Sequence, residues 1–153
     1  MVSRHAPGVA RFLAATGADP GEWDDLLQET FIRAFRSLTT WRGEAAFRSW
    51  LLSIASNLAK DQYRRRRKRT VVTLEESDLV AKEGPAETFD AREAERRMHQ
   101  GLGTLPRLQR EVFLLRAQQG LDYEEIARTL ETTPGSARVH YHHAVKRLKE
   151  LMA

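Results

Sequence analysis

Apolar residues recur at spacings of three and four along most of the chain, a period that indicates amphipathic helices rather than strands. The clearest stripe predicts a helix over residues 23–38, and its apolar members are Trp23, Leu26, Leu27, Phe31, Ala34, Phe35 and Leu38. We expect this whole stripe to be buried. Asp19 and Pro20 precede it as an N-cap and a first-turn proline. A shorter helix is predicted upstream, over residues 4–16, ending near Gly17.

A second strong helix is predicted from about Ala45 into the run of cations at residues 64–69. Its apolar stripe consists of Phe47, Trp50, Leu51, Ile54, Ala55 and Leu58. Its other face is polar and mostly cationic, with Arg48, Ser53, Ser56, Asn57, Lys60 and Arg64. The pattern therefore predicts one face that packs and one that can meet DNA.

The second half of the chain predicts four helices, over residues 93–102, 107–118, 123–130 and about 134–151. Leu105-Pro106 separates the first two, and Gly120 ends the second. Only Glu131, Thr132 and Thr133 separate the last two, which is the spacing of a helix-turn-helix. Since no segment alternates like a strand, we expect an all-α protein.

Charge divides the chain into three parts. Residues 1–69 carry 13 basic and 7 acidic side chains, residues 70–97 carry 4 and 8, and residues 98–153 carry 8 and 6. The acidic part contains Gly84-Pro85 and no sustained helical period. We therefore predict two small helical domains, residues 1–69 and 93–153, joined by a flexible acidic linker over residues 70–92.

Composition excludes several classes of function. The chain has no cysteine, which removes disulfides, thiolate zinc sites and cysteine nucleophiles and suits a reducing compartment. No apolar run is long enough to span a bilayer, and no signal-peptide pattern follows Met1. Acids are scattered along helix surfaces instead of clustering as a nuclease or similar enzyme requires. We expect a cytoplasmic, non-catalytic protein with no cofactor and no membrane insertion.

The helix-turn-helix supplies the first candidate site. Residues near the start of its second helix reach base edges and phosphates in the major groove. Here they are Ser136, Arg138, Val139, His140, His142 and His143. Arg138 is the best candidate because a guanidinium can hold guanine with two hydrogen bonds. The alternative is a helical hairpin with a merely solvated polar face; a metal site on the histidines lacks a third ligand.

A second candidate site joins the two strong N-terminal helices. The cations at residues 64–69 continue a polar track through Asn57 and Lys60. The loop over residues 41–49 offers an aromatic face for base stacking and arginines for phosphates. Trp41, Phe47 and Trp50 are alternatively core residues, and for Phe47 and Trp50 we favour that interpretation.

The outer side of the helix over residues 23–38 is acidic within a basic domain. It presents Asp25, Gln28 and Glu29 together with Ile32 and Arg36. This mixture suits a protein partner better than DNA, although an ordinary solvated face would look the same.

These features occur in an order that resembles the extracytoplasmic-function group of the sigma-70 family. DDLLQETFIRAFRSL (residues 24–38) resembles the region 2 helix that grips core RNA polymerase, and WRGEAAFRSWLLSIASNLAKD (41–61) resembles the adjoining −10 reading part. LPRLQREVFLLRAQQGLDYEEIARTL (105–130) is similar to region 4 as far as the first helix of its helix-turn-helix.

The resemblance implies roles for particular residues. Polymerase binding falls on Asp25, Gln28 and Glu29. Contact with the −10 element falls on Trp41, Arg42, Arg48, Ser49, Asn57, Lys60 and Arg64. Contact with the −35 duplex falls on Ser136, Arg138, Val139, His140, His142 and His143, although His140 and His143 stand where the family often has arginine. Glu131 occupies a turn position that is often glycine.

The resemblance also implies partners. They are core RNA polymerase, promoter DNA (double-stranded at −35 and single-stranded at −10) and an anti-sigma factor. The predicted function is that of a sigma factor that directs promoter-specific initiation. The alternative is a stand-alone helix-turn-helix regulator, which would bind duplex DNA without polymerase.

Overall fold

The computed structural model describes residues 2–17, 19–41, 47–69 and 89–152. The first half contains α1 (Val2–Ala15), the 3-10 helix η1 (Pro20–Glu22), α2 (Trp23–Arg36), the 3-10 helix η2 (Leu38–Thr40) and α3 (Phe47–Arg69). The second half contains α4 (Phe89–Thr104), α5 (Arg107–Phe113), the π-type turn η3 (Leu114–Gln118), α6 (Tyr123–Leu130) and α7 (Pro134–Met152). No strand occurs in these ranges, which confirms the all-α prediction.

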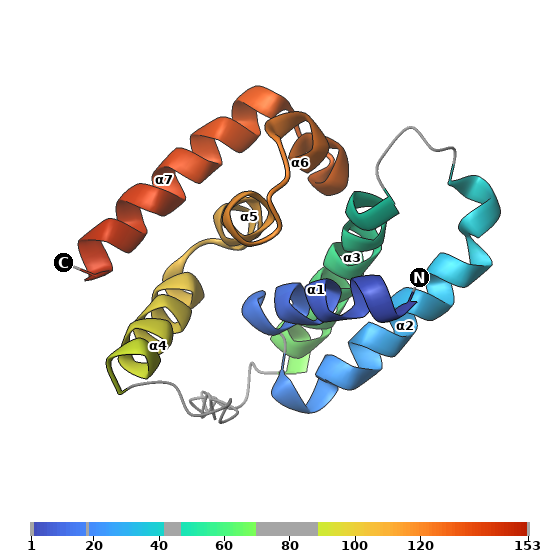
Figure 1. Cartoon of the computed structure of the whole chain (residues 1–153), viewed down its shortest axis with the longest axis horizontal. Coiled ribbons are helices and arrows are strands. Elements are labelled where there is room, and N and C mark those ends of the chain that lie inside the picture. The colour runs from blue at the N-terminus through green and yellow to red at the C-terminus, as the bar shows by residue number, and fades with distance from the viewer. Residues whose placement is uncertain (1, 18, 42–46, 70–88, 153) are drawn as a thin grey trace.

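The helices form two groups that lie side by side (Figure 1). We call α1 to α3 the N-terminal unit and α4 to α7 the C-terminal unit. In the N-terminal unit α2 packs on α3, and α1 lies against both. In the C-terminal unit α5 and α6 pack on α7, and α4 lies along the far part of α7. The predicted linker over residues 70–92 lies mostly outside the described residues, and α4 begins within it, at Phe89.

The buried stripe of α2 differs from the predicted one. Leu26, Thr30 and Ala34 face the core, whereas Phe35 is 72% exposed and Leu38 42% exposed. The prediction that Phe35 and Leu38 are buried is therefore wrong. The buried stripe was not recognised in the sequence because it includes the polar Thr30. The Thr30 hydroxyl donates to the carbonyl of Leu26 in its own helix at 2.7 Å, so this side chain can be buried at little cost in free energy.

The helix-turn-helix follows its predicted spacing. Asp122 caps α6 by accepting a hydrogen bond from the backbone N–H of Glu125 at 2.8 Å. The hydroxyl of Thr133 accepts from the backbone N–H of Ser136 at 3.1 Å, ahead of Pro134 in the first turn of α7. Between these caps Glu131 has a φ of 55°, in the left-handed region.

The helix predicted over residues 107–118 is interrupted by a π-type turn. The N–H of Gln119 bonds to the carbonyl of Leu114, five residues earlier, at 3.0 Å. Leu114 and Leu115 are both buried although they are consecutive. Gly120 follows with a φ of 73°, where a side chain would be strained. The turn thus directs Gln119 toward the N-terminal unit.

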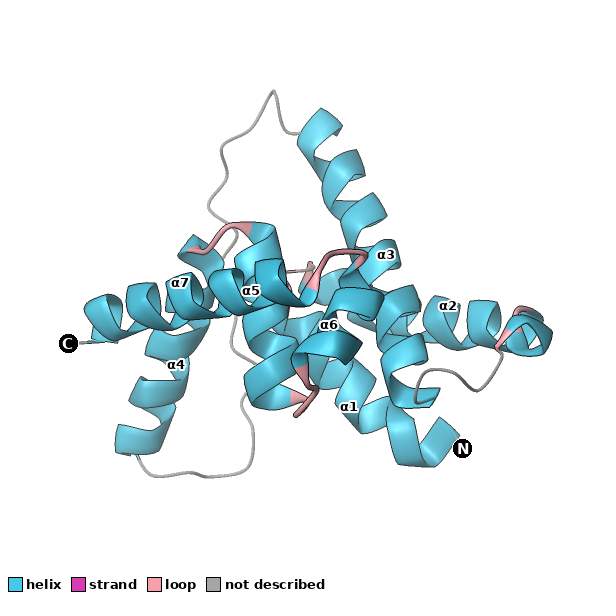
Figure 2. Ribbon diagram, turned by 90° about the horizontal axis from the view of Figure 1, so that it is seen from above, coloured by secondary structure: helices cyan, strands magenta, loops and turns pink. Residues whose placement is uncertain are grey.

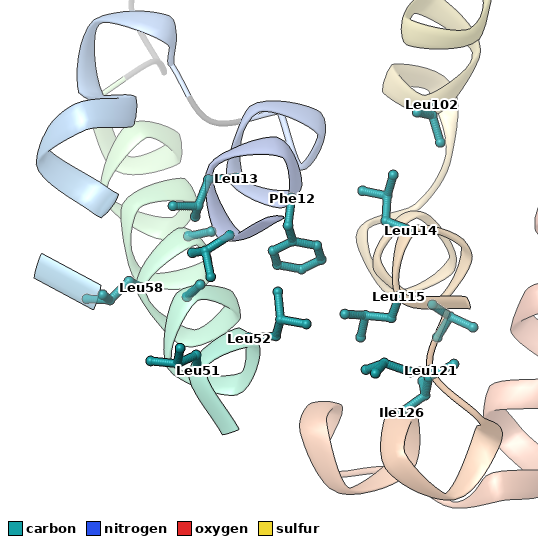
Figure 3. Packing of buried hydrophobic residues seen from close by; sticks show 14 of the residues in the cluster. Phe12, Leu13, Leu51, Leu52, Leu58, Leu102, Leu114, Leu115, Leu121 and Ile126 are labelled. Atoms are coloured by element: carbon teal, nitrogen blue, oxygen red, sulfur yellow. The ribbon is translucent and has the colours of Figure 1, made fainter. Parts of the chain in front are cut away.

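The apolar core runs without a break from one unit into the other. Phe12 and Leu52 point from the N-terminal unit toward Leu114 and Leu115 of the C-terminal unit (Figure 3). All four side chains are at most 3% exposed. We call this contact between the units the seam, and its burial makes the two units stabilise each other.

Strain at Glu131 can be tested with two substitutions. We expect Glu131→Gly to unfold with a free energy about 1 kcal/mol higher than Glu131→Ala, because only glycine lacks the Cβ that the left-handed region penalises. Urea denaturation followed by circular dichroism measures both. Since both variants lose the same carboxylate, equal stabilities would show that the turn is unstrained.

Candidate nucleic-acid interface

The outer face of α7 carries most of the residues predicted to meet duplex DNA. Arg138, Val139, His142 and His143 are exposed, and Val139 is exposed by 53% although it is apolar. The opposite face carries Ala137, Ala144 and Leu148, which are buried against the rest of the unit. The first turns of α7 therefore form a presented surface of the kind that enters a major groove.

Ser136 and His140 are less available than their neighbours. Ser136 is half-buried beside the cap made by Thr133. His140 is also half-buried, and its Nδ1 is buried with no hydrogen-bond partner among the described residues. Within those residues no three histidine or carboxylate side chains gather closely enough to hold a metal ion.

Two arginines lie over the ring of Tyr123, at the junction of α6 and α7. The guanidinium carbon of Arg138 is 5.1 Å from the ring centre and that of Arg116 is 4.7 Å away. Tyr123 in turn meets Tyr141 edge to face, with the ring centres 6.2 Å apart. Such cation–π contacts restrict the arginine rotamers, so Arg138 is held near the start of the presented surface.

The polar track on α3 is also accessible. Asn57 and Arg64 are exposed, and Lys60 between them is half-buried. They recur every three or four residues and thus share one side of the helix. Figure 2 shows the C-terminal end of α3 extending beyond the body of the protein.

Trp41 belongs to an aromatic cluster at the start of α3. Its ring centre is 5.3 Å from that of Phe47 and 6.4 Å from that of Trp50. Phe47 and Trp50 are partly buried against the core, as favoured above. Trp41 is half-buried as well. Arg42 and the rest of the loop to residue 46 lie outside the described residues.

Arg48 and Ser49, also predicted to meet DNA, lie at the seam or beneath the surface. Arg48 Nη2 donates to the backbone carbonyl of Gln119 at 2.7 Å, and Ser49 is only 3% exposed. Gln119 also donates from Nε2 to the carbonyl of Gly8 at 3.0 Å. Arg48 is otherwise exposed, so of the predicted −10 residues that the structure describes only Ser49 is buried.

The seam has a polar centre made by a buried carboxylate. Glu111 is 1% exposed, and its Oε1 accepts from the Ser56 hydroxyl at 2.8 Å and from Arg107 Nη2 at 3.2 Å. The same Arg107 nitrogen lies 3.0 Å from Oε2 without hydrogen-bond geometry and donates to the carbonyl of Ser56 at 3.1 Å. Ser56 belongs to α3, so this network joins the two units.

Arg110 joins the units a second time. It donates to the carbonyl of Thr16, at the end of α1, at 2.6 Å. It also donates to carbonyls of its own unit, those of Leu102, Gly103 and Leu105. Burial lowers the pKa of Arg110, while the neighbouring Glu111 opposes that shift.

Sequence reasoning missed the residues of the seam. Glu111 lies three residues after Leu108 and four before Leu115, so its carboxylate falls within the apolar stripe of the helix. An acid at such a position signals a buried polar contact. The acid in the apolar stripe does not reveal its partner, because Ser56 lies 55 positions away in the sequence.

The predicted protein-binding face of α2 is open. Asp25 and Gln28 are exposed, and Glu29 is partly exposed and paired with Arg33 at 3.2 Å. Ile32 and Phe35 continue the same side of the helix and are exposed by 43% and 72%. This row of acidic and polar side chains, followed by an apolar patch, is what we call the α2 face. Exposed apolar patches of this kind mark interaction sites.

Each of the two units matches the model of a known protein family. Residues 1–69 match the family model of sigma-70 region 2, and residues 95–148 match that of sigma-70 region 4. The RNA polymerase sigma factor CarQ of Myxococcus xanthus is 30% identical over 152 residues, which cover 99% of this chain and 87% of CarQ. The sigma-E factor of Escherichia coli K12 is 33% identical over 148 residues, covering 90% of this chain and 71% of that protein.

Two solved structures share the fold. The sigma factor RpoE of Bartonella quintana, solved with the anti-sigma factor NepR, superposes with a TM-score of 0.85 at 21% identity, over 99% of this chain and 93% of RpoE. CnrH, solved with the cytosolic domain of CnrY, superposes with a TM-score of 0.74 at 26% identity, over 99% of this chain and 84% of CnrH.

The hydrogen bond between Ser56 and Glu111 should be measurable as stability. We expect Ser56→Ala to lower the free energy of unfolding by about 1–3 kcal/mol, because a buried carboxylate loses one of its donors. Ser53→Ala is the matched control, since the Ser53 hydroxyl donates to Trp50 within its own helix. Urea unfolding compares them, and equal losses would mean that the seam bond adds nothing.

The buried carboxylate also predicts a pH dependence. Burial is the main cause of the raised pKa of Glu111, and Arg107 and the Ser56 hydroxyl oppose it. The native protein then holds the proton at pH values where the unfolded chain has lost it. The free energy of unfolding therefore falls as pH rises from the ordinary glutamate value of 4.5 through the folded pKa.

We expect Glu111→Gln to flatten this slope, since an amide does not titrate. Urea unfolding at a series of pH values between about 4 and 8 measures the slope for each variant. Glu124→Gln, on the exposed first turn of α6, serves as control. A slope unchanged by Glu111→Gln would contradict the assignment.

Proposed function

The chain belongs to the sigma-70 family and is an RNA polymerase sigma factor, and from this we propose that its two units divide promoter recognition between them. The N-terminal unit binds core polymerase and the melted −10 strand. The C-terminal unit holds the −35 duplex. Two weak binding sites in one chain recognise a promoter more specifically than either site alone. Once one site has bound its promoter element, the other site meets its own element at a high effective concentration.

The observation that carries the proposal is the α2 face. Asp25, Gln28 and Glu29 lie next to the exposed apolar side chains of Ile32 and Phe35. Negative charge keeps DNA away from this surface, while an apolar patch beside it can be buried by a protein. We assign core polymerase as that protein.

The −35 duplex is assigned to the presented surface of α7. We expect Arg138, which lies over Tyr123, to meet guanine or phosphate, and the exposed His142 and His143 to extend the contact along the groove. Val139 can contact a thymine methyl group. A histidine offers phosphate fewer N–H donors than an arginine does, so we expect binding of the −35 duplex to depend on the −10 contact.

The −10 strand is assigned to Trp41, Asn57, Lys60 and Arg64, which lie along the outer side of α3 and its aromatic cluster. In the described arrangement Arg48 bonds to Gln119 and Ser49 is buried. Arg48 is otherwise exposed and needs only to release this bond, whereas a role for Ser49 in DNA binding requires a local opening. We propose that polymerase, by engaging both units, supplies the free energy for that opening.

We further propose an anti-sigma factor as a partner and the cytoplasm as the place of action, with no catalytic role. Within the described residues no helix has the length and apolar character needed to cross a membrane. A stand-alone helix-turn-helix regulator would account for residues 95–148 but leaves the region 2 match over residues 1–69 without a purpose.

Transcription in vitro tests the proposal. Core polymerase with this protein should start transcription at defined sites on a library of genomic fragments. A triple alanine variant at Asp25, Gln28 and Glu29 should reduce these transcripts by about tenfold or more, since loss of about 1.4 kcal/mol in docking already has that effect.

A matched triple variant at Glu95, Gln100 and Glu150, which are exposed on α4 and α7, should keep full activity. Circular dichroism verifies that both variants fold. Transcripts that survive the α2 variant would overturn the assignment of that face, and duplex binding without any transcription would favour the stand-alone regulator.

A further inference from the structure

The aromatic cluster at the start of α3 extends onto α1, a helix to which no function is assigned above. The His5 ring lies 5.3 Å from that of Phe47 with the two planes at 60°, so the rings meet edge to face. Phe47 in turn contacts Trp41 and Trp50, with ring centres 5.3 Å and 5.6 Å away. Three separate segments of the chain therefore build one aromatic surface, in which His5 and Trp41 are both half-buried.

Positive charge flanks this aromatic surface. Arg4 and Arg48 are exposed, and Arg48 uses Nη2 for its bond to the carbonyl of Gln119. Burial is the main cause that lowers the pKa of His5, and the charges that add to it are positive, those of Arg4 and Arg48 among them. At neutral pH the imidazole is therefore an uncharged ring beside two guanidinium groups.

Half-buried rings beside cations suit single-stranded nucleic acid. A melted strand exposes the π faces of its bases, and these faces stack on aromatic side chains, histidine included. The phosphates of the same strand bind neighbouring cations. A duplex keeps its base faces inside the stack, and an acidic peptide would bind the cations while leaving the rings uncovered.

We propose that α1 completes the binding site for the melted −10 strand, with the His5 ring stacking on a base and Arg4 binding a phosphate. The inference rests on the assignment of that strand to Trp41 and α3 in the proposed function. Phe47 contacts both His5 and Trp41, so a base on one ring lies close to a base on the other. Neighbouring nucleotides of one strand can therefore use both rings. The N-terminal helix, otherwise a packing element, thus takes part in holding the strand.

Photochemical cross-linking of the full chain locates the strand on the protein. The probe is a single strand of about 16 nucleotides, the upper site size of single-strand-binding modules, in which 5-bromodeoxyuridine replaces thymidine. Ultraviolet light joins bromouracil to side chains that touch it, and mass spectrometry identifies the modified residues. We expect adducts at His5 and Trp41. Adducts confined to other segments would overturn the proposal, and this test needs no variant.

Substitutions of His5 test the stacking contact by fluorescence anisotropy with the same strand. His5→Ala should weaken binding by about fivefold or more at about 0.15 M salt, because stacking of one base contributes at least that factor. His5→Phe keeps an aromatic ring and should retain the affinity within about twofold. His99→Ala, at a half-buried histidine of α4, is the matched control and should bind as the unchanged protein does.

The salt dependence of binding tests the phosphate contact of Arg4. Arg4→Ala should reduce the slope of log K against log salt concentration by about 0.7, the loss of one phosphate contact on a single strand. Arg92→Ala removes the same charge from an exposed position on α4 and should leave the slope unchanged. Equal slopes for the two variants would contradict a phosphate contact at Arg4.

The stacking role is disproved if His5→Ala binds as tightly as His99→Ala, or if His5→Phe loses as much affinity as His5→Ala. Circular dichroism and the melting temperature show whether each variant is folded. None of these measurements uses polymerase or a promoter, so a failure of this site and a failure of the proposed function appear in different experiments.

Discussion

The buried carboxylate of Glu111 is the constraint on which the arrangement of the two units depends. A carboxylate that is 1% exposed needs partners, and the Ser56 hydroxyl and Arg107 supply them from opposite sides of the seam. Around it, Phe12 and Leu52 bury apolar surface against the C-terminal unit. Each unit alone would leave this carboxylate and these side chains in water, so the seam makes one body of two small units.

This closure decides which surfaces remain available. α2 lies on the far side of the N-terminal unit from the seam, and the C-terminal end of α3 extends beyond the body of the protein (Figures 1 and 2). Ser49, in contrast, is buried, and the exposed Arg48 bonds across the seam to the carbonyl of Gln119. Under the proposed assignment of DNA contacts, Asn57 and Arg64 are exposed whereas Ser49 is not.

Two local features explain where the seam lies and why the α2 face stays open. The π-type turn after α5 lets consecutive leucines, Leu114 and Leu115, enter the core and directs Gln119 toward Gly8 and Arg48. In α2, the small side chains of Thr30 and Ala34 face the core. The larger Phe35 is left outside, where it extends the α2 face.

The sequence by itself determined the helices, their approximate ends, the helix-turn-helix and the family, because local periodicity, caps and short motifs carry that information. It also placed Asp25, Gln28 and Arg138 on outward faces correctly. Only the tertiary structure decided that Phe35 is exposed, that Ser49 is buried and that Glu111 meets Ser56. These outcomes depend on contacts between residues far apart in the chain, and a helical period records that a face is buried without recording what covers it.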